Sequence, residues 1–163
     1  MLGDIIKEKD LEMVKNSLLT VLCNATGIFR RTVDSKDKEF KIKLEKIITK
    51  LRKQVNLGSI KNSDIRNAIK ELSSATGYSV GASQKPINVY LKFYAVLSCR
   101  KKILRELDCP IDSYVIKENG LKRISLKKLD FKDYEEMQNT LYKKYNGTRI
   151  LADILSWDIK KQY

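Results

Sequence analysis

Residues 36–55 constrain the fold of this chain more than any other segment. Apolar residues recur there at steps of four, three, one, three and four, which keeps them on one face of an α-helix. The residues of this face are Phe40, Leu44, Ile47, Ile48, Leu51 and Val55. A helix with one apolar face must bury that face against other elements, so we expect a core built from packed helices.

Similar spacing recurs along the rest of the chain and predicts six further helices. They span about 4–23, 62–72, 84–107, 112–119, 133–145 and 148–161. The residues expected to face inward in the last two are Tyr134, Met137 and Leu141, and Ile150, Leu151, Ile154 and Leu155. Asn62 or Ser63 is the expected N-cap of the helix over 62–72, and an Asn-Gly hairpin competes with the helix over 112–119. Since no internal repeat is present, we predict an all-α single compact domain of six to seven helices over residues 1–163.

The chain is strongly basic, with 33 Lys and Arg against 20 Asp and Glu and a formal net charge of +13. This excess goes beyond what solubility requires and predicts a polyanionic partner. Nucleic acid is the expected partner, with DNA ahead of RNA. An anionic membrane surface, an acidic protein, or a composition without functional meaning are the alternatives, although Glu does not rise with Lys as it does in heat-adapted proteins.

The absence of histidine excludes several classes of enzyme. Serine-triad hydrolases, His-based acid-base enzymes and His-bearing zinc deaminases all need this residue. The three cysteines, Cys23, Cys99 and Cys109, have no C-x-x-C spacing and no histidine to complete a zinc set. We therefore expect no metal site and no cofactor, and any catalysis must use Lys, Asp, Glu, Tyr or Cys.

The hydropathy pattern predicts the compartment. No stretch approaches the roughly 18 apolar residues of a membrane span, and residues 1–15 carry acidic side chains rather than a signal-peptide core. We expect a cytoplasmic protein with reduced thiols and no membrane partner.

Two groups of cations are candidate phosphate contacts. One lies along a side of the helix over 36–55, and the other ends the long predicted helix over 84–107. They comprise Lys43, Lys46, Lys50 and Lys53, and Arg100, Lys101, Lys102 and Arg105. A run of charges on a helix can also be a plain solvated face, which is the alternative interpretation.

Residues 87–97 are apolar on nearly all sides, which is typical of a central buried helix. Lys85, Asn88 and Lys92 form one narrow polar stripe on it. Pro86 would fall in the first turn, and burial together with the helix dipole would lower the pKa of Lys85 toward that of a nucleophile. Alternatively, both lysines reach the surface along their aliphatic stems and Asn88 bonds a neighbouring loop.

Two stretches carry a resemblance to a known family. They are Gly-Ala-Ser-Gln-Lys-Pro-Ile-Asn-Val-Tyr-Leu-Lys-Phe at 81–93 and Cys-Pro-Ile-Asp-Ser at 109–113. Together, over about 76–116, they resemble the catalytic region of helix-hairpin-helix DNA glycosylases, with archaeal 8-oxoguanine DNA glycosylase/lyases as the nearest group. The resemblance implies a Schiff-base lysine at Lys85 and the family's aspartate at Asp112. Lys92 also fits a lysine position, so the nucleophile stays open.

The resemblance also implies a mechanism and a set of contacts. The amine of Lys85 would attack C1′ of a flipped nucleotide while ionised Asp112 stabilises the developing charge, and the imine would allow β-elimination. Turn amides around Gly81 to Ser83 would bind a phosphate at the start of the helix, and Gln84 and Asn88 in the helix are further candidate contacts to nucleic acid. Asp112 has an alternative role as an N-cap. The alternative function is a non-enzymatic DNA- or RNA-binding helical protein of mobile-element or viral type, and a third is an interaction or toxin-like protein.

Overall fold

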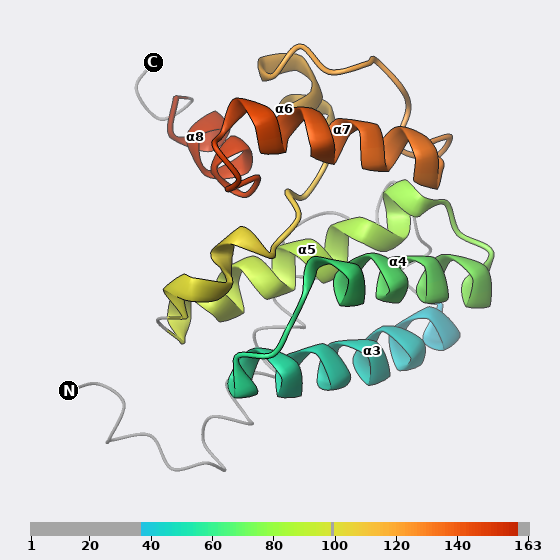
Figure 1. Ribbon diagram of the computed structural model, residues 1–163. Helices are drawn as coiled ribbons and strands as arrows, with labels where there is room; N and C mark the ends of the chain where they lie inside the picture. Colours follow the sequence, from blue (N-terminus) through green and yellow to red (C-terminus); the bar gives the residue numbers. More distant parts are fainter. Residues whose placement is uncertain (1–36, 99, 160–163) are drawn as a thin grey trace.

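The computed structural model describes residues 37–98 and 100–159 (Figure 1). The helix expected over residues 4–23 lies outside these ranges. The described chain consists of six α-helices and one short 3-10 helix, with no strand among them, which confirms the all-α prediction. The elements are α3 (Lys38–Leu57), α4 (Asn62–Thr76), α5 (Val80–Leu97), η1 (Lys101–Arg105), α6 (Ser113–Glu118), α7 (Phe131–Lys144) and α8 (Leu151–Ile159).

The prediction for α3 is confirmed, because all six residues of its predicted apolar face are buried. The Asp37 carboxylate begins the helix by accepting a hydrogen bond from the Phe40 amide at 2.9 Å. Gly58 ends it in a left-handed conformation, with φ of 67°.

The N-cap prediction for α4 is wrong, because the helix already includes Asn62 and its N-cap is Lys61. The Asp64 carboxylate closes this end by accepting from the Lys61 amide at 2.9 Å. The Asn62 side chain bonds outward instead, donating to the Glu106 carbonyl at 2.9 Å. Gly77 ends α4 with φ of 72°.

Helix α5 differs from its prediction at both ends. It begins at Val80, because the Ser79 hydroxyl caps it by accepting from the Ala82 amide at 3.2 Å. Gly81 is therefore helical, and Pro86 lies inside the helix rather than in its first turn. At the other end α5 stops at Leu97, and the chain turns into the separate helix η1.

The short helix α6 forms in place of the competing hairpin, and its N-cap is Asp112. Helix α7 buries the predicted residues Tyr134, Met137 and Leu141. The inward face predicted for α8 is wrong in part. Ile150, just before it, is buried, but Leu151, Ile154 and Leu155 are 36%, 36% and 45% exposed, whereas Ala152, Asp153 and Ser156 are buried.

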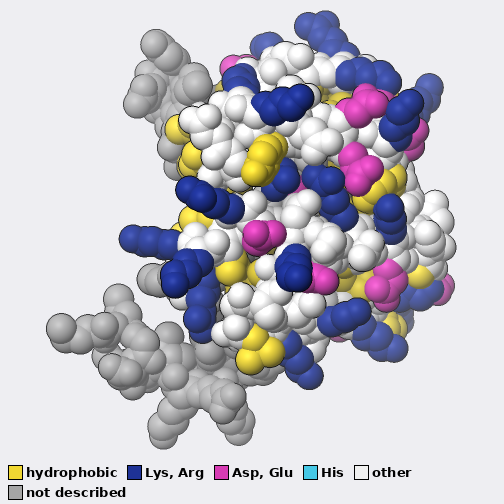
Figure 2. All heavy atoms as spheres, in the orientation of Figure 1, with side chains coloured by type: hydrophobic (Ala, Val, Ile, Leu, Met, Phe, Trp, Pro, Cys, Tyr) yellow, Lys and Arg dark blue, Asp and Glu magenta, His cyan; other side chains and the backbone are white. Residues whose placement is uncertain are grey.

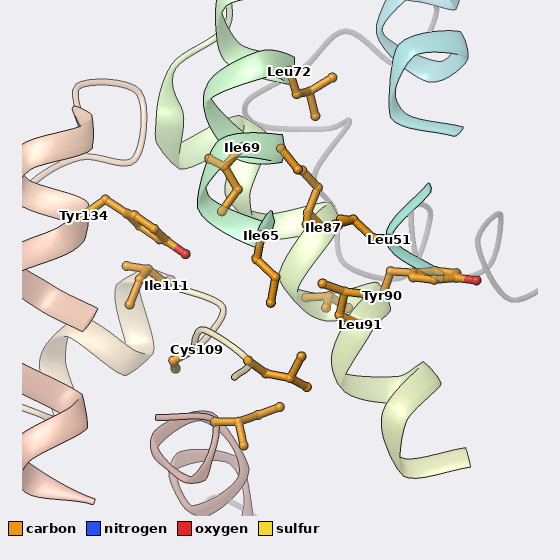
Figure 3. Packing of buried hydrophobic residues seen from close by; sticks show 14 of the residues in the cluster. Leu51, Ile65, Ile69, Leu72, Ile87, Tyr90, Leu91, Cys109, Ile111 and Tyr134 are labelled. Atoms are coloured by element: carbon orange, nitrogen blue, oxygen red, sulfur yellow. The ribbon is translucent and has the colours of Figure 1, made fainter. Parts of the chain in front are cut away.

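Helix α5 holds the described part of the fold together. It packs on α3 and α4 on one side and on α7 and η1 on others, while α6 and α8 pack against each other (Figure 1). Figure 3 shows Ile87, Tyr90 and Leu91 of α5 in the core, together with Leu51, Ile65, Ile69, Leu72, Cys109, Ile111 and Tyr134 from the surrounding elements. The polar residues of α5 must therefore be explained within a densely packed interior.

Candidate functional site

The amide side chains of α5 join it to the segment before α6. Gln84 donates to the Ile111 carbonyl at 2.7 Å and accepts from the Ile111 amide at 3.1 Å. Asn88 donates to Gln84 Oε1 at 3.1 Å and to the Tyr134 hydroxyl at 2.9 Å. Gln84 and Asn88 are 0% and 1% exposed. Both were expected to contact nucleic acid, but they satisfy buried polar groups of the fold instead.

The expected phosphate-binding turn at Gly81 and Ser83 does not form, because both residues belong to α5. The amide of Ser83 donates to the Ser79 carbonyl at 3.0 Å, and its side chain is fully buried. A Cβ placed on Gly81 would lie 2.1 Å from the Leu126 carbonyl oxygen. The start of α5 is thus covered by protein, and the glycine is needed for that close approach.

Lys92 forms a largely buried ion pair with Asp153 of α8, and the two side chains are 15% and 4% exposed. Its amine also lies 4.7 Å from the centre of the Phe93 ring. A lone buried charge is costly unless it is paired, so this contact explains why a lysine occurs on the inner side of α5. The amino group is engaged by a partner that sequence reasoning did not identify.

Lys85 lies in the second turn of α5 and is partly exposed. The expectation that it occupies the first turn is wrong, so the helix dipole gives no argument for its reactivity. Within the described ranges the side chain of Lys85 makes no hydrogen bond or ion pair. Asp112 accepts from the Tyr114 and Val115 amides at 3.0 and 2.8 Å, which confirms its alternative role as an N-cap. Lys85 directly follows Gln84 and Asp112 directly follows Ile111, so both adjoin the buried Gln84–Ile111 contact.

Sequence reasoning missed a buried carboxylate that four side chains approach, that of Asp108. Its buried carboxylate accepts from Asn62 Nδ2 at 2.7 Å, from Arg66 Nε at 3.2 Å and from the Tyr134 hydroxyl at 2.9 Å. Arg149 Nε lies 3.5 Å from Oδ1, the oxygen that also accepts from Asn62, whereas Arg66 and Tyr134 bond Oδ2. The contact thus joins α4, α7 and the turn before α8 at one buried charge.

Two pKa directions reflect this network. Burial, and next the charge of Asp108, raise the pKa of the Tyr134 hydroxyl well above its ordinary value. Burial acts to lower the pKa of Arg66, but the attraction of Asp108 prevails and the pKa is raised. Both groups therefore keep their protons, which suits a structural contact rather than proton transfer.

Three tyrosines on or beside α5, whose rings could otherwise stack on a base, are engaged in the fold. Tyr90 and Tyr94 are 1% and 4% exposed and stack on each other with ring centres 5.7 Å apart. The Tyr78 hydroxyl donates to Asp37 at 2.9 Å.

The cations of the second predicted group surround η1 and all face solvent. They are Arg100, Lys101, Lys102 and Arg105. Dark blue side chains gather at the left edge of Figure 2, at the level of η1 in Figure 1, whereas on the right they alternate with acidic ones. Among the described residues, none of these four cations is paired with a carboxylate.

The α3 cations divide into two kinds. Lys46, Lys50 and Lys53 are exposed. Lys43 instead pairs with Glu39 at 2.8 Å and donates to the Ala75 carbonyl, where it closes the C-terminal end of α4. The Tyr94 hydroxyl donates to Asn56 at 2.6 Å, which fastens the end of α3 to the end of α5 from which η1 departs.

The described ranges contain no group of three or more residues suited to hold a metal ion. None of their helices combines the length and the apolar character that crossing a membrane requires. Comparison of the chain with family models, with curated proteins and with solved structures finds no match.

Proposed function

We propose that the protein binds nucleic acid through its phosphates, using the cations around η1 and the exposed lysines of α3. The observation that carries this proposal is the exposure of all four η1 cations without a carboxylate partner in the described chain. An unpaired surface cation is free to replace a counterion on a phosphate, whereas a paired one such as Lys43 must first leave its partner.

We expect this binding to depend on the phosphate backbone of the nucleic acid rather than on its base sequence. Exposed Lys and Arg side chains position a protein on phosphates, while sequence is read by groups that reach base edges. The two amide side chains that were expected to contact nucleic acid, Gln84 and Asn88, are buried. DNA and RNA of any sequence are therefore expected to bind through the same surface.

The test is the salt dependence of binding to a labelled duplex. With seven cations contacting phosphates, affinity should fall by about 10³- to 10⁴-fold between about 50 and 200 mM salt. Affinity that stays flat over this range would contradict the proposal.

A matched pair of variants locates the surface. Replacing Arg100, Lys101, Lys102 and Arg105 by Gln removes four charges around η1, and replacing Lys127, Lys128, Lys132 and Lys143 by Gln removes four exposed charges elsewhere. Only the η1 variant should lower the logarithmic salt slope, by about 3 to 4. Equal slopes for the two variants would show that net charge alone controls binding and that η1 is not the surface.

A second candidate function is a lyase that uses Lys85. Three observations favour this function. The Lys85 side chain is partly exposed and has no partner in the described chain, and Lys85 and Asp112 directly follow the two residues of the Gln84–Ile111 contact. Borohydride should then trap the protein on DNA containing an abasic site or 8-oxoguanine, and Lys85→Gln should abolish trapping. Asp112→Asn is informative because Asn is an equally good N-cap, so lost trapping would report charge rather than unfolding of α6.

Lys92→Gln resolves the choice of nucleophile. Loss of trapping in this variant alone would move the nucleophile from Lys85 to Lys92. Because the change leaves Asp153 buried without its cation, the melting temperature of the variant must be measured alongside. Wild-type protein that binds DNA but is never trapped on it by borohydride would reject the lyase function and keep the proposed nucleic-acid binding.

A further inference from the structure

A cavity of about 510 Å³, widely open to solvent, lies between α6 and the segment that follows it. One wall comes from α6 and the other from residues 123–125. The residues that line it are Ser113, Ile116, Lys117, Arg123, Ile124 and Ser125. None of them belongs to the proposed nucleic-acid surface around η1, so the cavity requires its own explanation.

The fold holds both walls in place. The Leu121 amide donates to the Ile116 carbonyl at 3.0 Å, which fixes the chain as it leaves α6. Further along, the Leu126 carbonyl accepts from the Ser79 hydroxyl at 2.9 Å and lies against Gly81. The segment is therefore anchored at both ends, and the cavity is preformed rather than dependent on a ligand.

The cavity is positively charged. Lys117 and Arg123 line it, its lining contains no carboxylate, and neither cation has an ion-pair partner within the described part of the chain. Lys122 does not count among the unpaired cations near the cavity, because it pairs with Asp133 at 2.6 Å. Glu118 is one residue beyond Lys117, at about 100° around α6, and is absent from the lining. An anionic group between Lys117 and Arg123 would meet two free cations.

The rest of the lining suits an apolar, ring-sized group. Ile116 is only 6% exposed and Ile124 is half-buried, and both contribute aliphatic surface to the lining. Ser113 and Ser125 add hydroxyls, which can donate or accept. Small-molecule sites of about 300–1,000 Å³ commonly combine an apolar wall with a few polar groups in this way.

We propose that this cavity binds one nucleoside monophosphate unit, with its phosphate between Lys117 and Arg123 and its base against Ile116 and Ile124. The unit can come from a free nucleotide or from a nucleotide of a single strand. In the second case the inference rests on the proposed nucleic-acid binding and adds to it a pocket for an unpaired nucleotide.

The test follows the isoleucine methyl groups by NMR while AMP, adenosine, inorganic phosphate or a short single-stranded oligonucleotide is added. We expect AMP to shift the methyls of Ile116 and Ile124, with adenosine and phosphate each binding at least about tenfold more weakly. Arg123→Gln should weaken AMP binding by about 10- to 100-fold, since it removes one charge-assisted contact. Lys128→Gln is the matched control, because it removes an exposed cation of the same segment outside the lining.

Three results would overturn the inference: AMP that leaves both methyls unmoved, equal effects of the Arg123 and Lys128 variants, or phosphate that binds as tightly as AMP. Oligonucleotide binding that depends on the η1 cations but leaves the methyls unmoved would reject the single strand as the source of the nucleotide and keep the proposed function. Conversely, AMP binding in a protein with no salt-dependent DNA binding would reject the proposed function and assign the cavity to a free nucleotide. An oligonucleotide that shifts the same methyls as AMP supports the strand source.

Discussion

Removal of the Asp108 carboxylate should be among the most destabilising single changes in this protein. In Asp108→Ala, Arg66 and Arg149 would keep buried charges without their shared partner, and the Tyr134 hydroxyl and the Asn62 amide would lose an acceptor. Removing one partner of a buried ion pair costs about 3–5 kcal/mol. This is a large fraction of the roughly 5–15 kcal/mol by which a domain is stable.

The assay is thermal unfolding followed by circular dichroism. In a chain of this size each kcal/mol shifts the melting temperature by about 2–4 °C, so Asp108→Ala should lower it by about 6–20 °C. Glu135→Ala is the matched control, because Glu135 contacts the same Arg66 at 3.3 Å but its side chain is 42% exposed. A surface pair of this kind contributes about 0–1 kcal/mol, so the control should melt within about 4 °C of the wild type.

A third variant separates charge from hydrogen bonding. Asp108→Asn keeps the size of the side chain and one acceptor oxygen, but removes the charge that the two arginines face. It should therefore destabilise by an amount between those of the other two variants. If Asp108→Ala melts no lower than Glu135→Ala, the Asp108 network is not the structural contact that its geometry indicates.

Three further predictions concern other elements. Gly81→Ala should destabilise by about 1–3 kcal/mol in urea unfolding, because the added Cβ would lie 2.1 Å from the Leu126 carbonyl oxygen; unchanged stability would contradict that close approach. The Asp37 pKa is lowered, chiefly by the Phe40 amide, so this carboxylate stabilises the fold above its ordinary pKa of 3.8 and loses that contribution as the pH falls through the lowered value. Urea unfolding between about pH 6 and 2 should show a smaller loss for Asp37→Asn, and an identical pH dependence would refute the assignment. Burial raises the pKa of the Cys109 thiol well above 9.0, so in a variant that retains only this cysteine the native protein should resist Ellman's reagent until it unfolds.

The sequence predicted α3 well because a single signal determines it. Six apolar residues share one helical face, and all six are buried. The start of α5 differs from its prediction for a physical reason: Gly81 and Ser83 have low helix propensity and indicate a turn. Their helical conformation depends on the Ser79 cap and on packing against Leu126, which lies 45 positions beyond Gly81.

The orientation of α8 shows how a buried charge can override apolar spacing. Leu151, Ile154 and Leu155 favoured one inward face, yet the structure turns Asp153 inward to pair with Lys92. A lysine on the inner side of α5 must be given a carboxylate, and this requirement acts over 61 positions of sequence. The apolar periodicity of α8 contains no information on the need of Lys92 in α5 for a buried carboxylate.

The same limit explains why the polar stripe of α5 was interpreted as a binding site. A polar residue within an apolar helix has either a ligand or a buried partner, and its spacing is identical in both cases. For Gln84 the partner is the backbone of Ile111, which any residue except proline would supply at that position. A backbone partner leaves no signature in residue type, so only the three-dimensional contact distinguishes the two. Exposed cations such as those around η1 need no distant partner in the chain, which is why their exposure followed from composition while the internal network did not.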